Sequence, residues 1–99
     1  MLIFRPMTSA GIEVSTDVQM AAFKQWSERP TMTYSGLAAD LCRAYRIING
    51  IDVPDVEHPM HRASDRLVQS LRKAGMVERK GSIWTITDRG QNLRAEMTQ

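Results

Sequence analysis

Cysteine is nearly absent from the sequence, and its scarcity excludes several classes of protein. The one cysteine, Cys42, has no partner for an intrachain disulfide, a thiolate metal cluster or a C-x-x-C redox pair. A chain of this kind suits a reducing compartment, so we expect a cytoplasmic protein. Cys42 itself lies at the edge of an apolar helical stripe, where we expect a small core residue and not a nucleophile.

Long apolar runs are also missing. No segment approaches the run of about eighteen apolar residues that a membrane helix needs. The apolar start of the chain is shorter than the core of a signal peptide and is broken at Arg5 and Pro6. We therefore expect neither a membrane span nor export.

Catalytic motifs are missing as well. The sequence has no glycine-rich phosphate loop, no nucleophile elbow and no recognisable acid pair. His58 and His61, with Asp55 or Glu57 nearby, are residue types found in zinc sites. However, H-x-x-H spacing is common by chance, Pro59 lies between the two histidines, and no cysteine is available nearby. We expect no metal, no cofactor and no enzymatic activity.

The composition that remains is that of one globular domain. Of its 99 residues, 42% are hydrophobic and 24% are charged, which is an ordinary globular composition. A chain of this length and hydrophobic content can form one core. The formal net charge of +2 is too small to predict a polyanionic partner by itself. Its distribution is uneven, because residues 1–57 carry five basic and seven acidic side chains and residues 58–99 carry eight and four. The basic surface is therefore expected in the C-terminal part.

Periodicity and breakers divide the N-terminal half into four segments. Residues 1–15 have no sustained period, which predicts an extended arm with room for a short strand at its end. A helix is predicted over 16–28, with one face formed by Val18, Ala22, Phe23 and Trp26. After an extended piece at 31–33, a second helix is predicted from a cap at Thr33 or Ser35 to the Asn49-Gly50 stop. Its apolar stripe consists of Tyr34, Leu37, Ala38, Leu41, Tyr45 and Ile48.

The middle of the chain predicts an acidic loop followed by an amphipathic helix. Residues 51–59 contain two prolines and three acidic residues, Pro54, Pro59, Asp52, Asp55 and Glu57. A third helix is predicted from Met60 or His61 to Ala74, with Gly75 as its stop. Its apolar side is formed by Ala63, Leu67, Leu71 and Ala74. The opposite side carries long polar residues, namely Arg62, Asp65, Arg66, Gln69 and Lys73.

The C-terminal part predicts a hairpin and a last helix. Residues 76–80 and 82–87 alternate as two short strands, and their connection has the basic tip Arg79-Lys80. Thr87 is placed to cap a final helix that ends near Met97.

One run resembles a known family in detail. Residues 70–90, SLRKAGMVERKGSIWTITDRG, are similar to the L-x-K-A-G-L-[VL]-x-R … G-x-[WY]-x-[IL]-T-x-x-G pattern of winged helix domains, as in multiple-antibiotic-resistance-type regulators and the N-terminal domain of Mrr-type restriction enzymes. Residues 33–38, TYSGLA, resemble the T-Y-x-x-L-A opening of the helix before the recognition helix. The resemblance implies an α+β, mostly α fold: a winged helix-turn-helix over residues 16–99 with a two-stranded wing and a C-terminal helix, preceded by the arm at residues 1–15.

The resemblance also implies binding to double-stranded DNA. In such a domain the third helix enters the major groove, so Arg66 would contact a guanine edge and Gln69 an adenine edge. Phosphates would be neutralised by Arg62, Lys73, Arg79 and Lys80. The expected protein is a small transcriptional regulator of phage or bacterial type, and a homodimer through the arm or the last helix. The plainer interpretation of the polar stripe is the solvated face of an amphipathic helix.

The sequence departs from the family between Ile48 and Met60. A helix-turn-helix usually has three or four turn residues, and here there are about ten. The acidic side chains of this loop could lie beside the face that should meet phosphates. The alternative function is therefore a winged helix protein-interaction module, an adaptor or antagonist that docks on a larger assembly through the loop at 51–59 or the arm.

Overall fold

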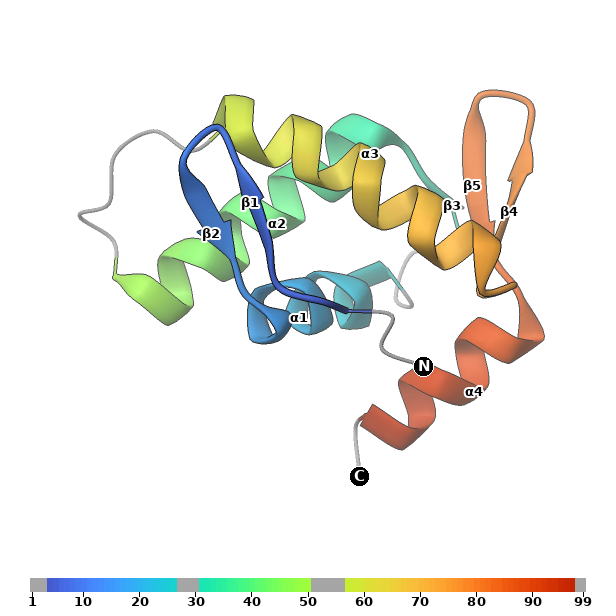
Figure 1. Cartoon of the computed structure of the whole chain (residues 1–99). Helices are drawn as coiled ribbons and strands as arrows, with labels where there is room; N and C mark the ends of the chain where they lie inside the picture. Colours follow the sequence, from blue (N-terminus) through green and yellow to red (C-terminus); the bar gives the residue numbers. More distant parts are fainter. Residues whose placement is uncertain (1–3, 27–30, 51–56, 98–99) are drawn as a thin grey trace.

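The computed structural model describes residues 4–26, 31–50 and 57–97. Within these ranges the chain is α+β and mostly helical, as expected from the sequence. It has four helices and five short strands (Figure 1), in the order β1 (Met7–Ser9), β2 (Ile12–Val14), α1 (Thr16–Trp26), β3 (Thr31–Met32), α2 (Tyr34–Asn49), α3 (Glu57–Lys73), β4 (Val77–Lys80), β5 (Ile83–Ile86) and α4 (Asp88–Met97). Among the described helices, none combines the length and the apolar character that a membrane-spanning helix needs.

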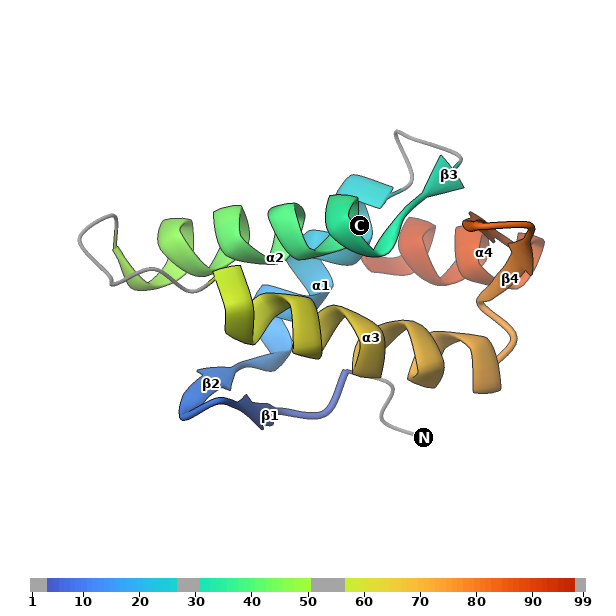
Figure 2. The same cartoon turned by 90° about the horizontal axis from the view of Figure 1, so that it is seen from above.

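Three helices form the centre of the molecule. α2 packs against both α1 and α3, and α4 returns to contact α1 (Figures 1 and 2). Many of the largest buried side chains come from the predicted apolar stripes, and Cys42 is buried with them. Val14, Gln19, Met60 and Val68 are also fully buried, although they were on none of these stripes. The fully buried set includes Val18, Phe23, Leu37, Leu41, Met60, Leu67 and Leu71. The side chains of Trp26 and Tyr34, which were predicted to lie on these stripes, fall outside what the structure describes.

Capping residues set the ends of α2. Thr33 is the N-cap, and its hydroxyl oxygen accepts a hydrogen bond from the Gly36 amide at 3.0 Å. At the other end Gly50 has a φ of 105° and its amide donates to the Arg46 carbonyl at 2.8 Å. The predicted start and stop are therefore confirmed, because each supplies a partner or a conformation that the helix end requires.

Two predictions are wrong: the start of α3 and the burial of Ile48 at the end of α2. α3 begins at Glu57, so residues 57–59 belong to its first turn and not to a loop. Proline is tolerated in a first turn because the amide it lacks would have no helical acceptor there. Ile48 was placed on the core stripe, yet it is 47% exposed at the last turn of α2. The rest of the predicted loop, residues 51–56, lies outside the described residues.

The N-terminal segment is a hairpin that shares the core and is not an extended arm. β1 pairs with β2 through Ser9 and Ile12, and Phe4 and Val14 on either side of the hairpin are buried. The loop residues Ala10 and Gly11 have φ values of 49° and 82°. Positive φ at both positions is what a two-residue type I′ turn requires.

Side-chain hydrogen bonds fasten this hairpin to α1 and α3. The buried Gln19 amide nitrogen donates to the carbonyls of Arg5 at 2.7 Å and Val14 at 3.1 Å. The Thr16 hydroxyl donates to the Phe4 carbonyl at 2.6 Å, and the Ser9 hydroxyl donates to the Pro59 carbonyl at 2.6 Å. Each bond gives a main-chain carbonyl oxygen a side-chain donor, and together the bonds hold the hairpin against both helices.

A three-stranded sheet holds the second hairpin in place. Its order is β3-β5-β4, so the extended piece predicted at residues 31–33 is the outer strand beside β5. β4 and β5 are antiparallel, and their pairs run from Val77 with Ile86 to Lys80 with Ile83. The loop between them is Gly81-Ser82. Gly81 has a φ of 66°, and the first position of a type II′ turn favours glycine for this reason. Trp84 on β5 is only 2% exposed, so this sheet contributes to the core.

The junction between α3, the hairpin and α4 explains most of the matched sequence pattern. The Met76 amide donates to the Leu71 carbonyl at 2.9 Å and the Gly75 amide to the Arg72 carbonyl at 3.0 Å, with Gly75 at a φ of 77°. This is a Schellman ending, which needs a left-handed residue where Gly75 lies.

Thr87 joins the two ends of the hairpin across that turn. Its hydroxyl donates to the Gly75 carbonyl at 2.6 Å and accepts from the Gly90 amide at 3.1 Å, so it also caps α4. Its own amide donates to the Met76 carbonyl at 2.9 Å. A Cβ atom on Gly90 would lie 2.2 Å from that same Met76 oxygen, so the close approach of α4 requires glycine.

Replacing Gly90 by alanine should therefore destabilise the protein. In an open helix position this change would stabilise by about 1 kcal/mol. Here the Met76 carbonyl is backbone and cannot swing away, so we expect a loss of about 2–3 kcal/mol in the free energy of unfolding measured in urea. Asn92→Ala, on the exposed side of α4, is the control and should leave stability unchanged or slightly raised. Equal stability of the two variants would contradict the proposed tight contact.

Replacing Ala10 should have the opposite effect. A left-handed conformation costs an L-residue with an ordinary side chain about 1 kcal/mol, and asparagine or glycine relieves that cost. Ala10→Asn should raise the melting temperature by a few degrees, given the size of the domain. Thr8→Asn, on the adjoining exposed strand position, should not raise it. A fall in melting temperature for Ala10→Asn would mean that the turn differs from the one described.

Candidate nucleic-acid interface

The polar face of α3 carries several exposed charged side chains. Residues at helical spacing are buried on one side of α3, from Met60 through Leu67 to Ala74. On the other side Arg62, Asp65, Arg66 and Lys73 are exposed, and Gln69 is half-buried. The sequence prediction of an amphipathic helix with this polar stripe is therefore confirmed.

Two hairpins flank this face. The β1–β2 hairpin contacts α3 near its N-terminal end and β4 contacts it near its C-terminal end. Figure 1 shows both hairpin loops projecting to the same side of the molecule, with α3 between them. The two hairpin loops therefore lie on one side of the molecule, at either end of α3.

Arg66 is held by the N-terminal hairpin. Its Nη1 donates to the Thr8 carbonyl of β1 at 2.8 Å. No sequence pattern indicates this contact, because the two residues are 58 positions apart. The guanidinium consequently lies at the flank of the polar face, over β1, and one of its donors is occupied.

Three of the other predicted residues, Gln69, Arg79 and Lys80, have local partners. The Gln69 Oε1 accepts from the Arg72 Nε at 3.1 Å. At the β4–β5 tip the Arg79 Nε donates to the Gly81 carbonyl at 2.8 Å, and the Lys80 Nζ lies 3.7 Å from the Glu78 carboxylate. These exposed contacts are weak in water, so the side chains can exchange them for other polar partners.

Two basic residues that sequence reasoning missed enlarge the positive surface. Arg72 is exposed in the last turn of α3 beside Lys73, where positive charge also complements the helix dipole. Arg89 of α4 reaches back over the end of α3, since a Cβ on Gly75 would lie 3.7 Å from its Nη1. Helical spacing could have indicated Arg72, whereas Arg89 depends on how α4 folds back. Residues 58–90 carry seven basic and three acidic side chains.

The histidines do not form a cluster with other metal ligands in the described chain. His58 and His61 are both exposed in the first turns of α3. Within residues 4–26, 31–50 and 57–97 no group of three His, Cys, Asp or Glu side chains is placed to hold a metal ion. Asp55, which was weighed as a third ligand, and Asp52 lie outside those ranges.

Comparison with protein-family models, with curated proteins and with solved structures gave no match for this chain.

The bond between Arg66 and Thr8 can be tested without any ligand. Arg66→Ala should speed hydrogen exchange of the amides of residues 7–14 by about three- to tenfold, because one charge-assisted hydrogen bond tethers the hairpin there. Arg62→Ala removes a similar exposed charge from α3 and should leave hairpin exchange unchanged. Unaltered exchange in Arg66→Ala would show that the tether contributes nothing to the order of the hairpin.

Proposed function

We propose that the chain is a winged helix protein that binds double-stranded DNA, as a small transcriptional regulator does. In this proposal α3 enters the major groove and the β4–β5 hairpin is the wing. The observation that carries it is the exposed basic face of α3 lying beside a hairpin with a basic tip. The order α1, β3, α2, α3, β4, β5 and α4 supports it further, because this is the order that the winged helix resemblance implies.

The dimensions of α3 suit a groove. Its 17 residues make a helix of about 25 Å, and the major groove of B-DNA admits one helix. A helix lying there has backbone phosphates on both sides. The β4–β5 tip projects past the C-terminal half of α3 (Figure 1). In this proposal Arg79 and Lys80, at the end of β4, contact the phosphates of one DNA strand.

The contacts of Arg66 change the roles assigned to the polar face. Because Arg66 is tethered at the flank, the centre of the face is formed by residues at spacing i, i+3 and i+7: Arg62, Asp65 and Gln69. Arginine pairs with guanine, aspartate accepts from cytosine and glutamine pairs with adenine. We assign base contacts to Arg62 and Gln69, with Asp65 as a third candidate. Phosphate contacts then fall to Arg66, Arg72, Lys73, Arg79 and Lys80.

Fluorescence anisotropy with duplex DNA at two salt concentrations tests these roles. Arg79→Ala and Lys80→Ala should each weaken binding to all duplexes alike and lower the salt slope by about one. Arg62→Ala and Gln69→Ala should instead relax sequence preference, at a cost of about 1–3 kcal/mol for the preferred site.

The matched control is Arg46→Ala, which removes an exposed arginine from α2. It should leave both the affinity and the salt slope unchanged. An equal loss in Arg46→Ala would mean that binding is unspecific attraction to the whole surface. Failure of the wild-type protein to bind any duplex at low salt would contradict the proposed function.

A further inference from the structure

Two neighbouring isoleucines on α2 are exposed where a core residue was expected. Ile47 is 75% exposed and Ile48 is 47% exposed, and they are the large apolar side chains that the described chain leaves open to solvent. Covering apolar surface of this kind is favourable by about 25 cal/mol per Å². Adjacent exposed apolar residues on a small protein therefore indicate an interaction surface.

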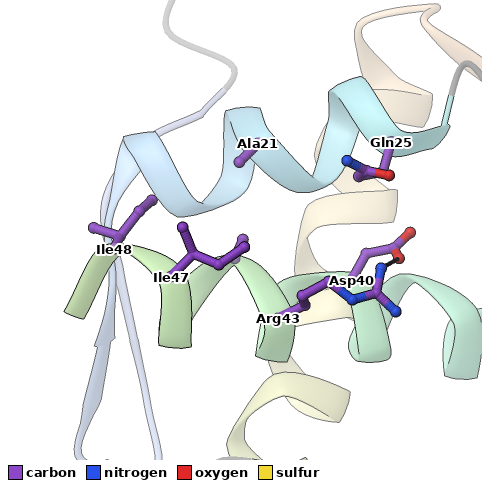
Figure 3. Close-up of a pocket in the computed structure, with 7 residues that line it drawn as sticks. Ala21, Gln25, Asp40, Arg43, Ile47 and Ile48 are labelled. Atoms are coloured by element: carbon purple, nitrogen blue, oxygen red, sulfur yellow. Dashed lines mark hydrogen bonds and ion pairs between the residues drawn. The ribbon is translucent and has the colours of Figure 1, made fainter. Parts of the chain in front are cut away.

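A hollow lies beside these isoleucines, between α1 and α2. It is lined by Ala21 and Gln25 of α1 and by Asp40, Arg43, Ala44, Ile47 and Ile48 of α2 (Figure 3). Its volume of about 70 Å³ is far below the roughly 300–1,000 Å³ of pockets that hold metabolites. The small side chains of Ala21 and Ala44 leave room for one protruding side chain and not for a cofactor.

Opposite charges lie at the two ends of this surface. At one end the buried Asp40 carboxylate is 3.3 Å from Arg43 Nη1, and the Arg43 side chain is 61% exposed. Toward the other end, Asp17 is exposed one helical turn before Ala21 on the same row of α1. Figure 3 shows the order along the groove, with Ile48 and Ile47 near Ala21, and Gln25 near Arg43 and Asp40.

We propose that this surface, the α1–α2 face formed by Asp17, Ala21, Arg43, Ala44, Ile47 and Ile48, binds a second copy of the same chain. A two-fold axis through its middle reverses the direction of the facing copy. Asp17 then meets the partner subunit's Arg43, and the same pair forms again on the other side of the axis. Ile47 enters the partner's hollow, so a protruding side chain and a cavity on each copy complement each other.

The other surfaces suggested for dimerisation are less suitable. The N-terminal hairpin packs on α1 and α3, and Leu93 and Met97 of α4 pack on the core. The α1–α2 face contains no residue of α3 or of the β4–β5 hairpin, so the inference does not rest on DNA binding. Because two helices offer a narrow face, we expect a monomer–dimer equilibrium with a Kd of about micromolar order.

Sedimentation equilibrium of the full chain over a concentration series tests the proposal. The wild-type protein should dimerise, and Ile47→Lys should raise the dimer Kd at least tenfold by placing a charge against the hollow. Asn92→Lys adds the same charge at an exposed position of α4, outside the face, and should leave the Kd unchanged. A wild-type chain that stays monomeric up to about 1 mM, the weak limit of specific association, would overturn the proposal. A dimer unaffected by Ile47→Lys would also overturn it.

Charge reversal gives a sharper test of the two-fold arrangement. Asp17→Arg and Arg43→Asp should each dissociate the dimer, because both pairs then bring like charges together. A mixture of the two variants should form a heterodimer, since every introduced charge faces its opposite. Failure of the mixture to associate, with both variants folded by circular dichroism, would contradict the arrangement. Should Arg43→Asp unfold, Asp17→Arg alone decides, and an unchanged Kd for that variant refutes the pairing.

Discussion

The close approach of α4 to the Met76 carbonyl oxygen is the constraint on which the C-terminal half depends. Gly75 turns the chain out of α3, and the Thr87 hydroxyl then bonds the Gly75 carbonyl while capping α4. Only glycine at position 90 allows the helix to come this near. These bonds join both ends of the β4–β5 hairpin to the end of α3. The hairpin therefore keeps one position relative to the polar face, which a groove-binding surface requires.

The local features of the fold could be predicted from the sequence because each has a local cause. Thr33, Gly50, Gly75 and Thr87 satisfy helix ends, and the stripes around Leu37 and Leu67 follow the helical period. The hairpin at residues 7–14 could not be predicted in this way, because Ala10-Gly11 is not the usual Asn-Gly turn sequence. The start of α3 was misplaced because Pro59 suggests a break, although a first turn accepts proline.

The candidate interface was predictable only in outline. Spacing alone indicates which side of α3 is polar, since its buried side is continuous. The tether of Arg66 to Thr8 and the return of Arg89 over Gly75 depend on contacts between distant parts of the chain. The predicted burial of Ile48 was wrong because burial also depends on which distant element packs against a helix. Ile48 continues the stripe of α2, but no described element covers that side of the last turn. Periodicity predicts which residues face inward only as far as a neighbouring element extends.

Whether α3 and the β4–β5 hairpin bind DNA as proposed can be measured by mapping amide shifts in an NMR titration with duplex DNA. We expect the largest shifts in residues 61–73 and 78–83, and no change in residues 40–48 of α2 at a constant degree of dimerisation. Shifts concentrated on α1 and α2, or none on α3 at low salt, would contradict the proposal.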